Sequence, residues 1–333
     1  MKISLIICTY MRPKPLLNLL QSVKFQSKYP DEILIIDGST NEETSMMLNN
    51  NIFKKVKYFH VEPRFRGLTK QRNFGVEKAD CESEILAFVD DDTQLIEDYF
   101  EQLIKTFTED KAITGVGGVA VNENTWVKIN PNFEYNKYKY EIFEGFAYKE
   151  GQRNVVRNFL GLQSNLPAGK MPCFSHGKTC GFPLTDKIYE VDLLTGMSFA
   201  FRKIVFENIK FSAYFEGYGL YEDADFSIRA LKFGKNVINT KLQLQHFHNP
   251  SGRPNQYKYG KMVVRNGWYV WRVKNPKPSL NSFIKWHLIT ILLILIRFTN
   301  TITTNEKKNA LTESLGRTIG LISLIFNKPK MQN

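Results

Sequence analysis

Three consecutive aspartates, Asp90 to Asp92, directly follow the apolar segment 85–89. Neighbouring carboxylates repel one another, and a charge beside a buried strand is costly unless it has a partner. A divalent cation would neutralise them. Oxygen ligands favour Mg²⁺ or Mn²⁺, and protein-bound Mg²⁺ usually keeps substrate phosphates in its shell. The triplet therefore predicts a metal ion and a phosphorylated ligand. The alternative is an acidic surface turn, which suits the end of a predicted parallel strand poorly.

A second acidic cluster, Glu222, Asp223 and Asp225, opens a predicted helix within 216–234. Carboxylates at a helix N-terminus also complement the helix dipole, and for an isolated cluster that explanation would be preferred. The glycine-rich segment before this cluster and the aspartate triplet favour a catalytic role instead. One carboxylate facing a bound acceptor can remove the proton of its hydroxyl group, so we expect a general base here.

Basic residues are expected beside the acidic site. Arg66, Lys70 and Arg72 lie at the start of a predicted helix over 67–79, whose free N–H groups also favour anions. The whole chain of 333 residues has a formal net charge of +12, which indicates an anionic partner. Composition does not choose among nucleic acid, a phosphorylated small molecule and an acidic membrane, but no nucleic-acid-binding motif is present.

Strand and helix patterns alternate through the first 120 residues, which predicts an α/β fold with a mostly parallel sheet flanked by helices. The expected strands are 3–8, 32–37, 56–61 and 84–90. Ligands of such sheets gather outside the carboxyl ends of the strands. The polar residues expected at that edge, besides the aspartates, are Thr9, Tyr10, Arg12, Asp37, Ser39, Arg64 and Arg66.

The later part of the chain completes the predicted domain. Residues 122–190 have no clear period, and we interpret them as a long insertion over the site. Regular patterns return at 191–203, at 236–247 as a strand, and at 255–274 as a helix. We therefore expect one catalytic domain, 1–275, made of a nucleotide-binding half (1–120), the insertion and an acceptor half (191–275), followed by a helical tail, 280–333.

Two apolar helices are predicted in the tail, at 283–298 and 311–326. The most apolar part of the first is only Leu288 to Ile296, whereas a bilayer span needs about 20 residues. Flanking Lys285, Trp286 and Arg297 favour an interfacial helix. The alternative is a helical hairpin packed on the domain. Because 1–10 suits a first strand better than an export signal, we expect a cytoplasmic protein at the inner face of the cytoplasmic membrane.

Six segments, in the same order as in the family, resemble glycosyltransferase family 2, whose members have the GT-A fold. The resemblance covers roughly residues 1 to 270. One departure is that the family's usual Asp-Asp-Gly-Ser has a single acid here. The segments are "CTYMRP" (8–13), "IDGST" (36–40), "RGLTKQRNFGV" (66–76), "FVDDD" (88–92), "LTGMSFAFRK" (194–203) and "YEDADFSIRALKFG" (221–234).

The resemblance implies an inverting transfer of a hexosyl, deoxyhexosyl or related group from a nucleoside-diphosphate sugar, with Mg²⁺ or Mn²⁺ as cofactor. Asp90 and Asp92 would form an Asp-x-Asp metal site, with Asp90 and Asp91 reaching the ribose or the metal shell. Asp223 would be the general base. His246 is the preferred late metal ligand, and His248 is the alternative. The remaining expected donor-binding residues are Thr9, Tyr10, Arg12, Asp37 (through the base), Ser39, Arg66, Lys70, Arg72, Gly196, Met197 and Glu222.

Two other functions share some of these features. A sugar nucleotidyltransferase would share the sheet, metal and basic pocket, but it normally needs a glycine-rich phosphate loop after the first strand, and 8–15 contains no glycine. A non-catalytic, membrane-bound saccharide-binding module would explain the charge and the tail but neither acidic cluster. We therefore favour the transferase, with a saccharide acceptor that the tail suggests is lipid-linked and used for surface polysaccharide.

Overall fold

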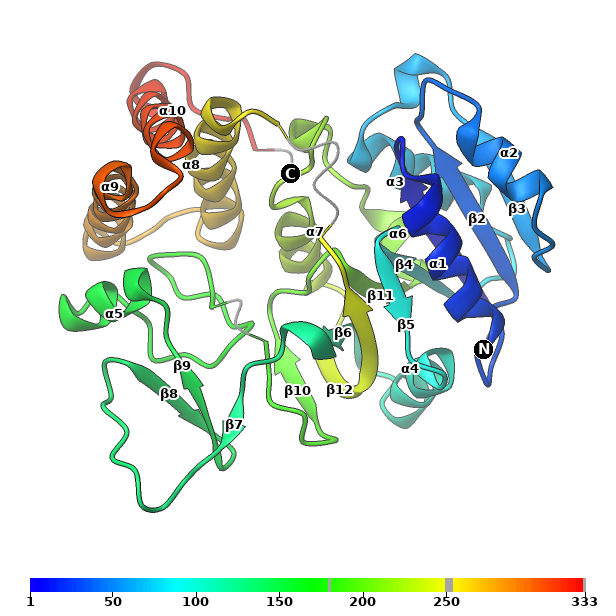
Figure 1. Ribbon diagram of the computed structural model, residues 1–333, viewed down its shortest axis with the longest axis horizontal. Helices are drawn as coiled ribbons and strands as arrows, with labels where there is room; N and C mark the ends of the chain where they lie inside the picture. Colours follow the sequence, from blue (N-terminus) through cyan, green and yellow to red (C-terminus); the bar gives the residue numbers. More distant parts are fainter. Residues whose placement is uncertain (179–180, 249–253, 332–333) are drawn as a thin grey trace. The chain divides into compact units, whose positions relative to one another are not determined.

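The computed structural model describes residues 1–178, 181–248 and 254–331 of the chain (Figure 1). Its contacts divide the chain into two units. The first contains Met1–Asn124 and Leu184–Arg253, and the second contains Thr125–Pro183 and Pro254–Asn333. We expected residues 255–274 to close the domain that contains the sheet, and this domain division remains a prediction.

A nine-stranded sheet forms the centre of the first unit, with strand order β10-β12-β6-β11-β4-β1-β2-β3, while β5 pairs with β12 (Figure 1). Its strands are β1 (Ile3–Thr9), β2 (Glu32–Asp37), β3 (Val56–His60), β4 (Ile85–Val89), β5 (Thr93–Leu95), β6 (Ile113–Ala120), β10 (Ile188–Val191), β11 (Ser198–Arg202) and β12 (Lys235–His246).

The half of the sheet built by the first strands is parallel, as the alternating pattern predicts. β1 pairs in parallel with β2 and β4, and β2 pairs in parallel with β3. The other half is mixed. β12 runs parallel to β6, but β11 is antiparallel to β4 and β6, and β5 and β10 are antiparallel to β12. Periodicity does not encode strand direction, which is why the sheet is less parallel than predicted.

Both faces of this sheet carry helices. On one face, alternate residues of β1, such as Leu5 and Ile7, share a core with Leu16 of α1 and with Phe100 and Phe107 of α4. Prolines in the first turn of α1 start that helix, because proline has the required φ and no N–H to leave unpaired. The helical segments are α1 (Pro13–Lys24), α2 (Glu43–Asn49), η1 (Pro63–Phe65), α3 (Leu68–Lys78), α4 (Tyr99–Glu109), η2 (Val121–Glu123), α6 (Lys203–Asn208), η3 (Ala213–Phe215) and α7 (Glu222–Ala230).

Aromatic rings fill the core on the other face. Phe88 and Phe199, on neighbouring strands, have centroids 5.2 Å apart, and Phe211 stacks on Phe226 of α7 at 4.3 Å. Burying large aromatic side chains is a major source of stability. These rings also form the floor beneath the charged residues described below.

The second unit contains a three-stranded antiparallel sheet and four helices within the described residues. We expected much of this sheet's sequence to be irregular. Trp271 of α8 stacks on Trp286 of α9, with centroids 5.3 Å apart, and α10 packs along α8. The elements are β7 (Val127–Lys128), β8 (Tyr140–Phe143), β9 (Phe146–Lys149), α5 (Gln152–Phe159), α8 (Gln256–Lys274), α9 (Leu280–Thr303) and α10 (Lys307–Phe326).

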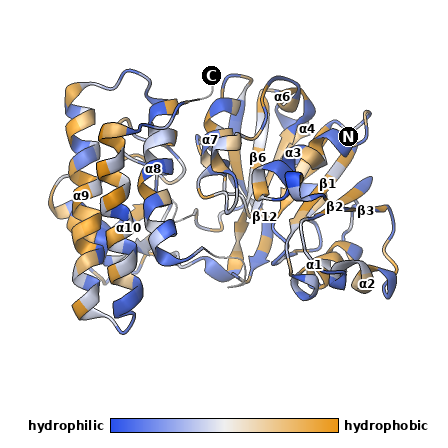
Figure 2. Cartoon of the chain, turned by 90° about the horizontal axis from the view of Figure 1, so that it is seen from above, coloured by the Kyte–Doolittle hydropathy of each residue, from blue (hydrophilic) through white to orange (hydrophobic). Residues whose placement is uncertain are grey.

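Helix α9 is longer than predicted. It has 24 residues, with a mean hydropathy of 1.6 over its most apolar window, and only 17% of that window is buried. At about 1.5 Å per residue such a helix is long enough to cross a bilayer. The prediction that both tail helices are too short to span is therefore wrong for α9. Figure 2 shows the apolar colouring that runs along it.

Candidate active site

The aspartate triplet lies at the carboxyl end of β4, between β1 and β11 in the sheet. Asp91 and Asp92 are almost fully buried, with 4% and 6% of their surface exposed. Asp90 is more open, with a side chain that is 37% exposed. The main chain of the triplet is held by residues next to β11 and β12, since Asp90 N donates to Met197 O at 3.1 Å and Phe247 N donates to Asp92 O at 3.0 Å.

Asp91 is the member of the triplet that ties the loop to its neighbours. Thr9 Oγ1 donates to Asp91 Oδ2 at 2.7 Å, and Arg12 Nη1 lies 3.0 Å from Oδ1. Burial raises the pKa of Asp91 to about 7, against the opposing effects of Arg12 and Thr9. Both oxygens therefore have partners within the protein, and Asp91 fixes the β1 and β4 ends together.

Asp90, Asp92 and His246 bring ligand atoms within 4.8 Å of one another, a spacing at which they could hold a metal ion. The β5–β12 pairing causes this convergence, because it places His246 opposite Thr93, next to Asp92. Burial raises the pKa of Asp90, which Arg72 lowers and Asp92 raises further. Burial lowers the pKa of His246, but Asp92 and Asp90 outweigh it and raise the pKa.

This donor set fits the expected cofactor. Two carboxylates and one imidazole suit Mn²⁺, and Mg²⁺ also accepts carboxylate oxygens. The paired negative charges are close together and partly desolvated, so a divalent cation would relieve their repulsion. When bound, the ion would be held by Asp90, Asp92 and His246, and it would neutralise charge on a diphosphate.

Arg72 is a buried cation placed over the aromatic floor. It is 3% exposed, its guanidinium lies 4.8 Å from the centroid of Phe199, and it pairs closely with Glu222. Its Nη2 is also 3.5 Å from Asp90 Oδ1. Burial would lower the pKa of Arg72, but the charges of Glu222 and Asp90 raise it, so the guanidinium stays charged. Arg72 thus links the aspartate triplet to the second acidic cluster.

Of the three carboxylates in the second cluster, Asp223 is the one left accessible. Glu222 pairs with Arg72, and Asp225, 1% exposed, pairs with Arg229 at 2.5 Å. Asp223 instead accepts main-chain hydrogen bonds, from Gly196 N and Ala224 N, both at 2.8 Å. No ion pair of Asp223 occurs in the parts of the chain that the structure describes.

Gly196 allows the two clusters to approach each other. Its carbonyl accepts a bond from Arg72 Nη2 at 3.2 Å while its N–H holds Asp223. A Cβ added at Gly196 would lie 3.2 Å from both Arg72 Nη2 and Glu222 Oε1, which is a tight contact. A side chain would therefore crowd the contact between Arg72 and the carboxylates.

The expected nucleotide-side residues lie at the ends of β1 and β2. Asp37 is fully buried and accepts bonds from Ser39 N at 2.8 Å and Tyr58 Oη at 2.9 Å. Ser39 Oγ accepts from Met11 N at 2.7 Å. Tyr10 is 46% exposed at the same edge. These contacts order the edge, and nucleotide contacts by these residues remain predictions.

The other basic residues predicted at the site lie around the start of α3. Lys70 forms an ion pair with Glu216, at 3.2 Å. Arg66 is partly buried, and its Nε has no hydrogen-bond partner in the described structure. Their roles toward a donor remain predictions.

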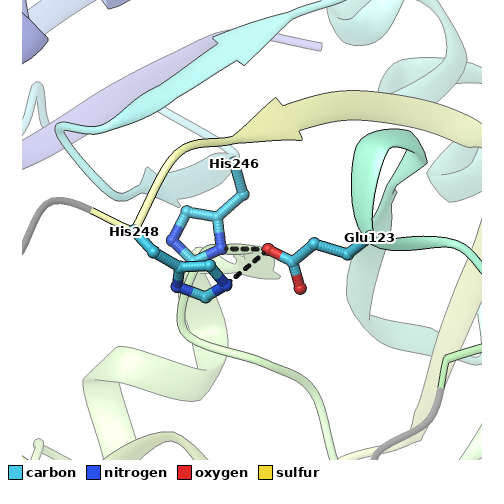
Figure 3. A group of neighbouring side chains, drawn as sticks. All are labelled: Glu123, His246 and His248. Carbon is cyan, nitrogen blue, oxygen red and sulfur yellow. Dashed lines mark hydrogen bonds and ion pairs between the residues drawn. The ribbon is translucent and has the colours of Figure 1, made fainter.

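Two polar residues near the site, Glu123 and Tyr58, were not predicted from the sequence. Glu123 Oε1 lies 2.8 Å from His246 Nδ1 and 2.9 Å from His248 Nε2 (Figure 3). Tyr58 contacts Asp37 as described. Glu123 follows β6 by three residues, so the rule that placed the aspartates, polar groups beyond strand ends, could have found it. Tyr58 lies inside β3 and carries no such signal.

Comparison with known proteins identifies the domain. Residues 4–164 match the family model for glycosyl transferase family 2. The chain contains a glycosyl transferase family 2 domain. The resemblance predicted from the six segments is therefore confirmed. The match ends before 194–203 and 221–234, so the roles inferred from those two segments remain predictions.

Two curated relatives match part of the chain. A glucosyl-dolichyl phosphate glucuronosyltransferase from Haloferax volcanii is 27% identical over 135 residues, 40% of this chain and 42% of that protein. An O-antigen chain rhamnosyltransferase from Salmonella typhimurium is 29% identical over 110 residues, 33% of this chain and 34% of that protein. The chain thus spans less than half the length of these relatives.

A solved structure supports the fold. The mannosyltransferase PcManGT from Pyrobaculum calidifontis, solved with GDP-Man and Mn²⁺, superposes with a TM-score of 0.56 at 11% identity, covering 98% of this chain and 88% of that one. The GT-A fold expected of the family 2 domain is confirmed.

Proposed function

We propose that this chain is an inverting glycosyltransferase that moves a sugar from a nucleoside-diphosphate donor to a hydroxyl group of a saccharide acceptor. The observation that carries the proposal is the pairing of two acidic groups at one sheet edge. Asp90 and Asp92, with His246, could hold a cation, and Asp223 is an open carboxylate connected to them through Arg72 and Gly196.

Each group suits one part of an inverting displacement. A divalent cation bound at Asp90, Asp92 and His246 would stabilise the charge that develops on the departing nucleoside diphosphate. Asp223 would accept the proton of the acceptor hydroxyl, because it is the carboxylate of its cluster that is not neutralised by arginine. Arg72 would fix the position of the metal site relative to Asp223 without contacting the acceptor.

A donor screen tests this activity. Purified protein is incubated with a panel of nucleoside-diphosphate sugars and simple saccharide acceptors, and released nucleoside diphosphate is measured with Mn²⁺, with Mg²⁺ and with excess EDTA. We expect release with at least one donor, only when a divalent cation is present, and much less with Asp223→Asn. Release of pyrophosphate instead, from a sugar phosphate and a nucleoside triphosphate, would indicate a nucleotidyltransferase.

We also propose that the acceptor is lipid-linked and serves surface polysaccharide synthesis. The names of the two relatives refer to a dolichyl phosphate-linked sugar and to an O-antigen chain. The exposed apolar side chains of α9 and α10 are consistent with a protein that works at a membrane. Transfer to a lipid-linked acceptor in vesicles, compared with a matched soluble acceptor, tests this part.

The tail would bind the inner face of the cytoplasmic membrane as an interfacial hairpin. Exposed apolar residues form a stripe along each helix, at 284, 288, 291, 295, 298 and 302 of α9 and at 311, 315, 319 and 322 of α10. Spacings of three and four residues keep such a stripe on one helix face. Lys307 and Lys308, both exposed at the start of α10, would favour anionic headgroups.

A polar network argues for the interface rather than a span, although α9 is long enough to cross. Arg297 of α9 lies 2.8 Å from Glu313 of α10, which also pairs with Arg317 at 2.6 Å. Carrying three charged groups into hydrocarbon is costly, whereas an interfacial hairpin keeps them within the protein and near the headgroups. Extraction of the bound protein by high salt or carbonate would support peripheral attachment, and resistance to both would support a span.

A further inference from the structure

His246 faces a carboxylate with each of its two ring nitrogens. Nε2 lies 3.4 Å from Asp92 Oδ1. Nδ1 lies 2.8 Å from Glu123 Oε1, and Figure 3 shows this second contact. A neutral imidazole has one N–H and one lone pair, so it can donate to only one of these carboxylates. Its other nitrogen then directs a lone pair at an anion, which is unfavourable unless a cation lies between them.

The two sides of the ring differ in charge. Nε2 faces Asp92, and Asp90 and Asp92 both bring a carboxylate oxygen within 4.8 Å of a ligand atom of the ring. Beyond Nδ1 is the single carboxylate of Glu123, whose same oxygen is also 2.9 Å from His248 Nε2. A divalent cation is stabilised more by two carboxylates than by one that is already shared. The cation therefore belongs on the Nε2 side, and the ring proton belongs on Nδ1, where Glu123 accepts it.

The backbone around Glu123 is built to hold this arrangement. Its neighbour Asn122 donates from Nδ2 to His246 O at 2.7 Å and accepts at Oδ1 from His246 N at 2.9 Å. The two-way contact fixes η2 against the end of β12, where the parallel partners Ala120 and Leu244 already align the strands. Glu123 thus reaches His246 from a fixed position, although its own side chain is 39% exposed.

We infer that Glu123 is a positioning residue, which holds the proton of His246 on Nδ1 and thereby presents the Nε2 lone pair to the cation at Asp90 and Asp92. His248 steadies the Glu123 carboxylate from the outer side. The inference rests on the proposed metal-dependent function of the same site. Carboxylates that accept the distal N–H of a metal-bound histidine raise its basicity and fix its orientation, and losing one typically costs about 10–100-fold in metal affinity.

Binding of Mn²⁺ alone, without nucleotide, tests the inference by calorimetry. Glu123→Gln should weaken Mn²⁺ binding by roughly 10-fold or more, because the amide no longer provides the negative charge. Glu207→Gln, which removes an exposed carboxylate from α6, is the matched control and should bind as the unmodified protein does. Thermal melting of each variant confirms that it is folded.

A double-mutant cycle shows whether Glu123 acts through His246. In a His246→Ala background, Glu123→Gln should cause no further loss of Mn²⁺ affinity. An equal loss in both backgrounds would overturn the inference. ¹⁵N NMR of the imidazole, at a pH where the ring is neutral, should show the Nδ1–H tautomer and a loss of that preference in Glu123→Gln.

The same titrations separate this inference from the proposed function. If Asp92→Asn binds Mn²⁺ as well as the unmodified protein, the metal site itself is wrong. If Asp92→Asn fails to bind but Glu123→Gln binds normally, only the role of Glu123 is overturned. Zn²⁺ binding that needs Glu123 and His248 but not Asp92 would identify a separate metal site and would also overturn the inference.

Discussion

The two units differ in the energetically unfavourable side chains that they contain: buried charged ones in the first unit and exposed apolar ones in the second. The first buries charged side chains at its sheet edge and pairs nearly all of them, as with Arg72 and Glu222 or Asp225 and Arg229. The second leaves apolar side chains in water along α9 and α10, for example Leu295 at 55% and Ile302 at 80% exposure. Both choices oppose stability, so each indicates a ligand: a polar one at the sheet edge and an apolar surface at the tail.

The pairing also separates the roles of similar residues within the first unit. Within the second acidic cluster, Glu222 and Asp225 have arginine partners and maintain structure, whereas Asp223, held by main-chain N–H groups, remains available for chemistry. Exposure alone would not make this distinction, since many exposed carboxylates have no function. The predictions below test the contrast by removing one element of it at a time.

The largest effect is expected for Asp223→Asn. Without its general base the enzyme should lose about 10²–10⁴-fold in turnover, while metal-dependent binding of nucleoside diphosphate is retained. Asp225→Asn is the matched variant, and it should affect stability more than turnover because Asp225 pairs with Arg229. An active Asp223→Asn beside an inactive but folded Asp225→Asn would show that the assignment is wrong.

The next largest effect is expected for the buried ion pair of Arg72 and Glu222. Arg72→Met should lower the free energy of unfolding by about 3–5 kcal/mol, because it leaves Glu222 buried without its partner. Arg64→Met removes an exposed pair with Glu62, in which both side chains are at least 66% exposed, and should cost about 0–1 kcal/mol. Urea unfolding measures both. Equal, small losses would mean that the buried pair does not support the site.

The third prediction concerns the packing of the tail helices in the second unit. A Cβ added at Gly260 of α8 would lie 2.2 Å from Glu313 O of α10, so Gly260→Ala should destabilise by about 1–3 kcal/mol. Gly151→Ala, in the same unit with nothing within 4 Å of the added Cβ, should stay within about 0.5 kcal/mol. If the two variants have the same urea midpoint, α10 is not packed against α8 as described.

The smallest expected effect concerns the apolar stripe. Leu295→Gln should weaken binding to anionic vesicles by roughly tenfold, because a buried leucine contributes about 1.5–3 kcal/mol. Stability and transfer to a soluble acceptor should not change. Ile52→Gln, an isoleucine of the first unit that is 92% exposed, is the control and should bind vesicles normally. Vesicle binding that is unaffected by Leu295→Gln would exclude the stripe as the contact surface.

Much of the first unit could be predicted because its signals are local. The alternation of apolar runs and amphipathic helices predicted β1 to β4. The polar residues at the ends of those strands, among them the aspartate triplet, Thr9 and Asp37, were then expected at the site. The approach of His246 to Asp92 depends instead on β5, a strand of three residues that has no recognisable period. The resemblance suggested His246, but only the β5–β12 register explains its position.

Long-range pairing explains most of what sequence could not supply. Arg72 and Glu222 are 150 positions apart, so nothing local indicates that the arginine is neutralised by that carboxylate. Helix α9 was underestimated for a different reason. Its final turns contain threonine and asparagine, which interrupt the apolar pattern but not the helix. Apolar periodicity reports burial and can therefore miss the ends of an exposed helix.

The most direct test of the central claim is the metal dependence of nucleoside diphosphate binding. Melting temperature is followed for the unmodified protein and for Asp92→Asn, with a panel of nucleoside diphosphates, in Mn²⁺ and in EDTA. We predict that one nucleotide raises the melting temperature of the unmodified protein only when Mn²⁺ is present, and that Asp92→Asn shows no such rise. A rise of the same size in EDTA, or in Asp92→Asn, would contradict the account.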